Sequence, residues 1–563
     1  MELHNIIIVP PKKKDQDLTG SQRTIDDYLP FEGKIINNIS FMRLDPFGTS
    51  LWDTAYSNIN TFTRFGNALH FKTLERVLQR HIILEKGERL DPYKVADNER
   101  LIRELKYVED VRIMIRQEDP ESDLVDIIII TKDIWSKAFF MELQELDAGS
   151  FGFWDRNIFG TGNDFENNIH WNPGKSDFWG YDAIYKSRNI LGTFINSSIF
   201  YKNVFETESY GFTVDRKFYT PSTKYAGGIS YLKKRTVENI WYSQNLQTKE
   251  PLNFSILDFW LGRSFELNKN AVDRMKRINL ILASRLTGNN FTTRPAAVSE
   301  DLFFEYHNNI IWLNSVSLTA RAYYRSNLIY SFGRTEDIPN GWMSSLTFGK
   351  EFSEFNDRLY VAMKLAHGNF IGNLGYVYTS YSLGSFIADP GQYQQGISDL
   401  KLNYFTNLFI FGRYKFRHFI NFEYLKGIDR FELERININD KNGIRGLTAG
   451  GIYGQQKLTM NMESVLFAPS ILYGFRFAFF GFVDFALIGD QYSAVSELDN
   501  FNGVGFGIRI RNERLVFPTF QFRFAFYPGL ENIDPVDYFK FSGEKKLNPE
   551  DFSPGAPDLI KFQ

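Results

Sequence analysis

Apolar and polar residues alternate along many short segments between residues 151 and 528, and this period of two limits the possible folds more than any other feature. Segments 414–424, 473–479 and 504–510 place aromatic or aliphatic side chains at every second position. The same pattern is clear near the end of the chain, at Phe520, Phe522, Phe524 and Phe526. Successive side chains of a β-strand point to opposite faces. Each segment is therefore predicted to be a strand with one apolar face.

The apolar residues are not gathered into long runs. About 18 consecutive apolar residues are needed for a transmembrane α-helix, and no such run occurs, which excludes that class. The chain nevertheless has 55 Phe and 29 Tyr, more than a soluble core needs. This combination is typical of a transmembrane antiparallel β-barrel, whose apolar face meets lipid. We assign residues 136–528 to such a barrel, with about 16 strands if each strand and its turn take roughly 24 residues.

Charge and composition exclude several kinds of function. Lys and Arg total 64 against 67 Asp and Glu, whereas proteins that bind nucleic acid have a basic excess. The chain has no Cys, which excludes disulfides, zinc–thiolate sites and thiol nucleophiles. Its seven His residues include no pair at metal-ligand spacing on a helix, and no Gly-x-Ser-x-Gly or phosphate-binding loop occurs. We therefore expect neither an enzyme nor a bound metal or cofactor.

Residues 33–135 have helical periodicity and are predicted to form a separate domain. Apolar side chains at helical spacing predict a helix at 74–82, and Asp91 followed by Pro92 predicts the start of a second. The predicted strands are 35–42, 111–115 and 124–130, and segment 45–70 is too irregular to assign. The order β-α-α-β-β indicates a small α+β domain.

The two ends of the chain lie outside these units. Residues 1–32 include a lysine run and are predicted to be a solvated extension, and residues 529–563 are predicted to be a polar tail. The first residues lack the basic and long apolar segments of an export signal. Because such a barrel must be exported, we expect that the numbering begins at a processed or altered start; a cytosolic protein is the alternative.

The α+β domain followed directly by a barrel resembles the superfamily of outer-membrane assembly factors and protein translocases typified by BamA. In this resemblance the domain looks like a POTRA domain. The similar stretches are 87–91, 98–101, 107–113, 125–127 and 131–136. The resemblance implies a bacterial outer-membrane location, with the domain and the tail 529–563 in the periplasm.

A second similarity lies at residues 155–163, which resemble the first barrel strand of the superfamily. Asn157, Gly160 and Gly162 fall in this stretch, and glycine weakens strand pairing. We predict that this strand and the last strand, which carries Phe520, Phe522, Phe524 and Phe526, form a gate that opens sideways.

A third similarity is the stretch Gly443-Ile444-Arg445-Gly446, which resembles the signature of the long loop that folds back into the barrel. In the superfamily its arginine reaches an acidic residue on the inner wall. The alternation within 473–484 places Asp484 opposite the lipid-facing side chains, and Glu463 is a second candidate. Ala486 stands where the superfamily usually has Gly, which leaves the local packing open. A guanidinium can bind a carboxylate through two hydrogen bonds.

The resemblance implies an insertase or translocase that assembles or exports client polypeptides through a barrel that opens sideways. Its domain would receive unfolded clients by β-augmentation at strand 111–117. Accessory lipoproteins or periplasmic subunits are possible further partners. The alternatives are a dedicated two-partner-type secretion pore and a passive outer-membrane channel.

Overall fold

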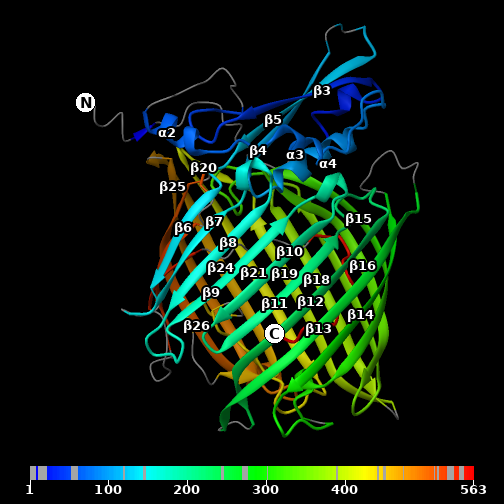
Figure 1. Ribbon diagram of the computed structural model, residues 1–563, viewed down its shortest axis with the longest axis vertical. Coiled ribbons are helices and arrows are strands. Elements are labelled where there is room, and N and C mark those ends of the chain that lie inside the picture. The colour runs from blue at the N-terminus through cyan, green and yellow to red at the C-terminus, as the bar shows by residue number, and fades with distance from the viewer. Residues whose placement is uncertain are drawn as a thin grey trace.

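In the computed structural model, a large antiparallel sheet curves around an interior, and a small α+β domain lies across one end of it (Figure 1). The structure describes residues 8–9, 22–51, 61–117, 119, 121–143, 147–242, 246–268, 277–300, 302–388, 391–440, 443–447, 452–472, 474–512, 514–515, 519–528, 538–543 and 551–563. Within these residues the large sheet has 23 strands, and the domain has a separate sheet of three.

We call the strands from β6 to β28 of the large sheet the wall, and each of them pairs antiparallel with the next. They are β6 (Lys137–Leu143), β7 (Gly149–Asp155), β8 (Asp164–Trp171), β9 (Trp179–Ser187), β10 (Asn196–Val204), β11 (Thr207–Arg216), β12 (Tyr225–Trp241), β13 (Gln247–Glu266), β14 (Asn279–Thr293), β15 (Asn309–Ser326), β16 (Glu336–Ser353), β17 (Arg358–Ile371), β18 (Gly375–Ala388), β19 (Gln392–Thr406), β21 (Tyr414–Ile428), β24 (Gln456–Leu472), β25 (Phe475–Gly489), β26 (Asp499–Arg511), β27 (Phe520–Phe526) and β28 (Phe539–Gly543). Three short strands pair at the side of a wall strand: β1 (Ile8–Val9) on β24, β2 (Gln22–Arg23) on β15 and β20 (Phe409–Phe411) on β21.

The wall has an apolar outer face and a mixed inner face. In β25, Phe479 and Val483 are each 44% exposed on the outer face. Asp484, which points to the opposite face, is fully buried. The alternation predicted for 473–484 is therefore confirmed. Among the residues that the structure describes, every helix is too short or too polar to span a lipid bilayer.

The estimate of about 16 strands is too low for this sheet. The first wall strands are short, with seven residues in β6 and in β7. They are also joined tightly: β10 ends at Val204 and β11 begins at Thr207. Short strands and hairpins use fewer residues per strand than the roughly 24 assumed from membrane-spanning lengths.

The strands at the two ends of the wall differ from those predicted. In the described residues β6 pairs only with β7, and β28 pairs only with β27, so the wall ends in two unpaired edges. The strand 520–526 is therefore not the last one, because β28 follows it within the predicted tail. Just before β6, the Trp135 amide donates to the Arg514 carbonyl at 2.8 Å, which joins the start of β6 to the β26–β27 connection.

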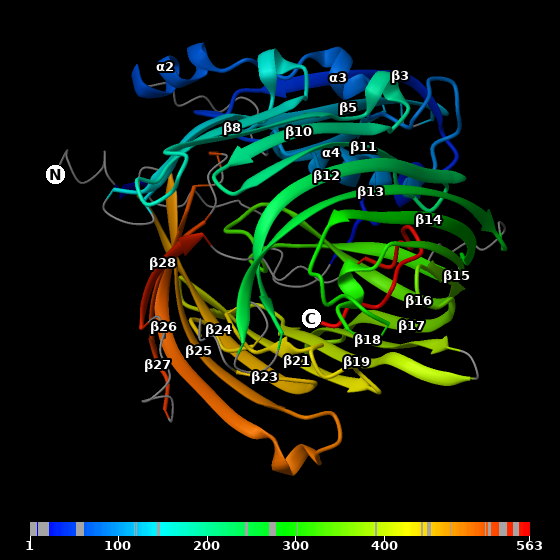
Figure 2. The same ribbon diagram turned by 60° about the horizontal axis from the view of Figure 1, so that its bottom comes forward.

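The end of the chain also lies elsewhere than expected. Residues 551–563 run through the interior of the wall instead of forming a tail outside it (Figure 2). The prediction that these residues form a polar tail outside the barrel is therefore wrong, and their periplasmic location stays a prediction. The segment lies inside because its apolar side chains pack on the wall: Phe552 is fully buried against the inner face.

The domain follows the predicted order with one more helix. It consists of β3 (Ile35–Leu44), α2 (Thr61–Leu69), α3 (Glu75–Gln79), α4 (Pro92–Arg103), β4 (Val108–Arg116) and β5 (Leu124–Asp133). Its sheet has the order β3-β5-β4, with β3 parallel and β4 antiparallel to β5. The predicted start of α4 is confirmed, because the Asp91 carboxylate accepts the Tyr93 amide at 2.9 Å. Helix α2 lies in the segment 45–70 that was left unassigned.

The core of the domain includes residues that we expected in a solvated extension. Tyr28 is buried among the apolar side chains of α4 and the domain sheet, and Ile25 and Phe31 pack against them. Thr24 also contacts the wall, because its hydroxyl donates to the Tyr323 carbonyl at 3.0 Å. Residues 22–31 therefore belong to the domain, and the extension predicted over 1–32 is wrong for this part.

Buried ion pairs hold the domain against the wall. Nη1 of Arg103 in α4 lies 2.6 Å from Oδ2 of Asp337 in β16, and Arg325 of β15 pairs with Glu99 of α4. Arg334 donates to the carbonyls of Val108 and Glu109 at the start of β4. The domain therefore covers one end of the interior.

Candidate functional site

The connection from β21 to β24 folds back into the interior of the wall. It contains β22 (Ile436–Asn437) and β23 (Tyr453–Gly454), which pair with each other. Gly446 has a φ of +88°, a backbone conformation that glycine adopts without strain. On the other side of Arg445, a Cβ on Gly443 would lie 2.9 Å from Cβ of Ile438. The two glycines thus let the backbone turn sharply around Arg445.

The structure brings Arg445 and Asp484 together. Nε of Arg445 lies 2.9 Å from one carboxylate oxygen of Asp484, and Nη2 lies 2.7 Å from the other. The Arg445 amide donates to the same carboxylate at 3.0 Å. Because Asp484 is fully buried, this two-pronged pair provides its charge partner away from water.

Glu463 of β24 lies in the same site and is shared between two arginines. Its carboxylate is 2.5 Å from Nη1 of Arg445 and 2.6 Å from Nη1 of Arg509 in β26. Sequence reasoning missed Arg509, although the alternation of 504–511 places it on the polar face. The guanidinium of Arg445 also lies 4.0 Å from the ring centroid of Phe482, within range of a cation–π contact.

The loop is also held by apolar packing. Ile444 and Leu447, on either side of Arg445, are fully buried in one cluster with Ala486 and Tyr527. The methyl group of Ala486, whose packing the sequence left open, is fully buried in this cluster.

The site connects the loop to four neighbouring strands near one edge of the wall. The hydroxyl of Tyr527, just after β27, donates to the Arg445 carbonyl at 2.6 Å. The side-chain amide of Asn461 in β24 donates to the Gly443 carbonyl and to Asp484, both at 2.8 Å. The loop therefore fastens β24, β25, β26 and the end of β27 from the inside.

The residues predicted as a first-strand gate lie elsewhere. Asn157, Gly160 and Gly162 form a turn between β7 and β8, with a 3₁₀ segment at Ile158–Gly160, so they are not in a strand. The turn contacts the domain: the Asn157 side chain donates to the Thr73 hydroxyl at 2.9 Å, and a Cβ on Gly160 would lie 2.3 Å from the Lys72 carbonyl oxygen. The glycines are therefore explained by the close approach of the domain and not by a weak strand edge.

The four phenylalanines predicted for the last strand do share a face. Phe522, Phe524 and Phe526 are exposed on the outer side of β27, whereas Arg523 is buried on the inner side. However, β27 is paired on both sides, with β26 and with β28. The predicted gate between a strand with Asn157, Gly160 and Gly162 and a last strand with Phe520 to Phe526 is therefore wrong.

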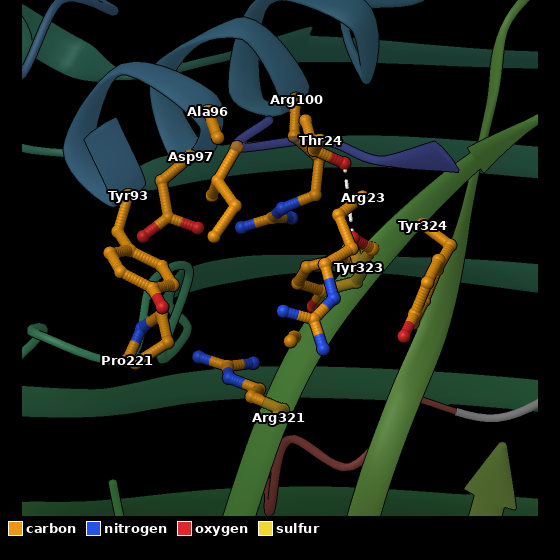
Figure 3. Close-up of a pocket in the computed structure, with 12 residues that line it drawn as sticks. Arg23, Thr24, Tyr93, Ala96, Asp97, Arg100, Pro221, Arg321, Tyr323 and Tyr324 are labelled. Carbon is orange, nitrogen blue, oxygen red and sulfur yellow. Dashed lines mark hydrogen bonds between the residues drawn. The ribbon is translucent and has the colours of Figure 1, made fainter. Parts of the chain in front are cut away.

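A cavity lies where the domain meets the wall (Figure 3). Arg100 of α4 and Arg321 and Tyr323 of β15 line it. The Arg100 guanidinium stacks on Tyr323 at 4.3 Å and donates to the Tyr219 carbonyl at 2.6 Å. Nearby, burial raises the pKa of the Glu99 carboxyl, although Arg325 and Arg103 oppose that shift. Among the described residues, no group of three or more His, Asp or Glu is placed to hold a metal ion.

Comparison with known proteins gives distant structural similarities only. No family model and no curated protein matches the sequence. Among solved structures, the chain is similar to BamA from Haemophilus ducreyi lacking POTRA domains 1–3, with 11% identity, a TM-score of 0.38, and 90% of this chain and 84% of that chain covered. It is also similar to CdiB from Escherichia coli, with 12% identity, a TM-score of 0.44, and 91% and 75% covered. A third similar structure is CdiB from Acinetobacter baumannii, with 12% identity, a TM-score of 0.33, and 95% of this chain and 94% of that chain covered.

Proposed function

We propose that this chain is a bacterial outer-membrane insertase or translocase, which assembles or exports client polypeptides through a wall that opens between its two edge strands. The observation that carries the proposal is the Arg445 site. It fastens β24 to β27 from inside, next to the edge strand β28, which pairs with β27 and has no second partner in the described residues. We call the boundary between the edge strands β6 and β28 the seam. A sheet that is held from inside in this way keeps its shape while the seam beside it opens.

Physical chemistry favours strand addition at such a seam. In a lipid bilayer an unpaired strand edge leaves its N–H and C=O groups without hydrogen-bond partners. A client strand that pairs with β6 or β28 satisfies these groups, and its folding into the bilayer is downhill without a nucleotide. We accordingly propose neither an enzymatic activity nor a cofactor.

The domain offers a second edge for clients, on what we propose is the periplasmic side. In the described residues β4 pairs only with β5. The first residues of β4 are covered by Arg334 and Thr335, because Arg334 binds the Glu109 carbonyl and Thr335 binds Asp110. Residues 111–116 are then the part of this edge where a client could add by β-augmentation.

The seam can be tested with disulfides, since the native chain has no Cys and an engineered pair is unambiguous. Cysteine pairs are scanned between β6 and β28, and the client-assembly activity of cells is measured with the bridge oxidised and reduced. A matched control joins Phe139 and Phe153, direct partners in β6 and β7, as Phe139→Cys with Phe153→Cys.

We expect an oxidised β6–β28 bridge to abolish activity and a reductant to restore it, whereas the control bridge leaves activity intact. Full activity with the seam closed would sink the proposal that clients pass through it.

A dedicated secretion pore is the second candidate, favoured by the presence of one small domain, β3–β5 with α2–α4, in the described chain. Depleting the protein and quantifying outer-membrane proteins separates the two. Loss of many unrelated barrels indicates general assembly, and loss of one exported protein indicates a dedicated pore. A passive channel would instead give a large steady conductance in a planar bilayer.

A further inference from the structure

Residues 551–563 line the inner face of the wall from β14 to β21 (Figure 2). They form no strand, and Pro554 and Pro557 lack the N–H groups that strand pairing needs. The segment is therefore held by side chains of the wall and not by extension of its sheet.

Three apolar side chains of the segment lie where the wall has glycine. Phe552 is fully buried beside Tyr376 and Tyr378, and a Cβ on Gly368 would lie 2.9 Å from its ring. A Cβ on Gly384 would lie 3.0 Å from Ile560. A Cβ on Gly427 would lie 3.1 Å from Phe562. At all three positions the Cβ would lie still closer to Tyr376, Ala362 or Arg430, respectively. Each glycine thus leaves room that a side chain of the segment shares with neighbouring residues outside it.

Polar groups of the wall bind the segment between these apolar contacts. Nη1 of Arg285 in β14 lies 2.8 Å from the Asp558 carboxylate and 3.1 Å from the Pro557 carbonyl. The Thr319 hydroxyl donates to the Phe552 carbonyl at 2.5 Å. The Ile560 amide donates to the Tyr360 hydroxyl at 2.8 Å.

The wall residues that bind the segment also have partners within the wall. Arg285 binds Asp258 of β13, with Nε 2.8 Å from the carboxylate. Arg321, which pairs with Asp551 of the segment at 3.3 Å, also donates to the Phe218 carbonyl at 2.7 Å. The side chain of Asp558 is 55% exposed. Departure of the segment would therefore leave Arg285 with a carboxylate and Arg321 with a main-chain hydrogen bond, which is the property of a site whose occupant can exchange.

We propose that this inner face is a binding site for an extended peptide, and that residues 551–563 occupy it in cis. The peptide it takes has an aromatic residue followed six positions later by a carboxylate, as Phe552 and Asp558 are. A client segment of this pattern competes with residues 551–563 and displaces them. Only the identification of the competing peptide as a client rests on the proposed function, since peptide binding can be measured without membrane insertion.

The test uses the full chain with the cis segment weakened by Phe552→Ala and Asp558→Asn. The probe is a fluorescent synthetic peptide of residues 551–563, and its anisotropy is measured against purified protein. We expect saturable binding at least tenfold tighter than to the unaltered chain, whose own segment competes. A probe with the same two substitutions should bind at least tenfold more weakly.

Matched glycine variants locate the binding on the wall. In the weakened chain, Gly368→Ala places a methyl group against the Phe552 position and 2.4 Å from the Tyr376 hydroxyl, and it should reduce probe binding. Gly288→Ala should not, because nothing lies within 4 Å of a Cβ there. If Gly368→Ala does not fold, Arg285→Gln replaces it with the same expectation.

Three results would overturn the inference: no saturable binding, equal binding to the weakened and unaltered chains, or equal binding of the native and substituted probes. Folding is checked by the shift in gel migration on heating. If the double variant does not fold, Asp558→Asn alone replaces it, since that side chain is half-exposed. Failure here would leave the seam experiment, and so the proposed function, untouched.

Discussion

At the scale of single residues, one loop arginine joins elements that are far apart in sequence. Arg445 has Asp484 and Glu463 as charge partners, and its own main chain binds Asp484 and Tyr527. A buried carboxylate without a partner is costly, whereas the pair as a whole adds little net stability. The site is therefore better understood as fixing the position of the loop than as a source of stability.

Replacing Arg445 tests this position. Arg445→Ala leaves the fully buried Asp484 without its guanidinium partner, and we expect a loss of about 3–5 kcal/mol. Arg445→Lys keeps the charge but not the two-pronged geometry, and we expect a smaller loss. Thermal unfolding of the purified protein measures both. Arg413→Lys, at an exposed turn, is the control, and an equal effect there would contradict the assignment.

The buried His81 makes the stability of the domain depend on pH. Burial lowers the pKa of its imidazole to about 4, and its Nδ1 lies 2.8 Å from the Val77 carbonyl. Between pH 6.5 and 4, His81 is protonated in the unfolded chain but stays neutral in the folded domain. Stability is therefore full above pH 6.5 and falls as the pH drops through this window, by about 3 kcal/mol in total.

Hydrogen exchange of the amides of α3 and α4 at several pH values measures this effect. His81→Gln cannot titrate, so its stability should fall less steeply over the same window. If both proteins show the same slope, another group is responsible.

At the scale of elements, two matching turns of the wall hold the short helix α3 of the domain. The sequence Asn-Ile-x-Gly-Thr occurs at 157–161 and again at 189–193, and each forms a tight turn whose central residue, Phe159 or Leu191, has a positive φ. The Asn157 side chain binds Thr73 before α3, and the Asn189 side chain binds the Arg80 carbonyl after it at 2.7 Å. The repeated motif is therefore a pair of contacts at the two ends of one helix.

Alanine at each asparagine should loosen this contact. Asn157→Ala and Asn189→Ala each remove a side chain that bonds to the domain and also closes its own turn, and we expect about 1–3 kcal/mol per site. Faster hydrogen exchange of α3, with the wall unchanged, is the predicted readout. Asn172→Ala alters an exposed turn away from the domain and should have no effect on α3.

At the scale of the whole molecule, the domain and the wall form one body joined by buried charges. Arg325 binds Glu99 and Asp27, and Arg103 binds Asp337 and Asp110. This network therefore fixes the domain over one end of the interior.

Arg325→Gln should free the domain, because it leaves the buried Glu99 with one arginine instead of two. The distribution of distances between a spin label on α4 and one on β16 should become broader in the variant. Arg277→Gln breaks the more exposed pair with Glu266 and serves as the control, for which about 1 kcal/mol or less is expected. An unchanged distance distribution would mean that Arg325 does not hold the domain in place.

Local structure and the faces of the strands could be predicted from the order of residues alone. Alternation of apolar and polar residues predicted that Asp484 points inward and Phe524 outward, because side-chain direction in a strand follows from position alone. Asp91 and Pro92 likewise predicted the start of α4, because capping uses neighbouring residues.

Which strands are edges, where the Asn157 turn lies and what fills the interior depend on contacts between distant parts of the chain. In a sequence, a glycine that lets another part of the chain approach cannot be told from a glycine that weakens a strand. The role predicted for Gly160 was wrong for this reason. Residues 551–563 have no periodicity, and their position depends on Gly368, Arg285 and other wall residues distant in sequence. Contacts of this kind exist only after the wall has folded, which is why no local pattern announces them.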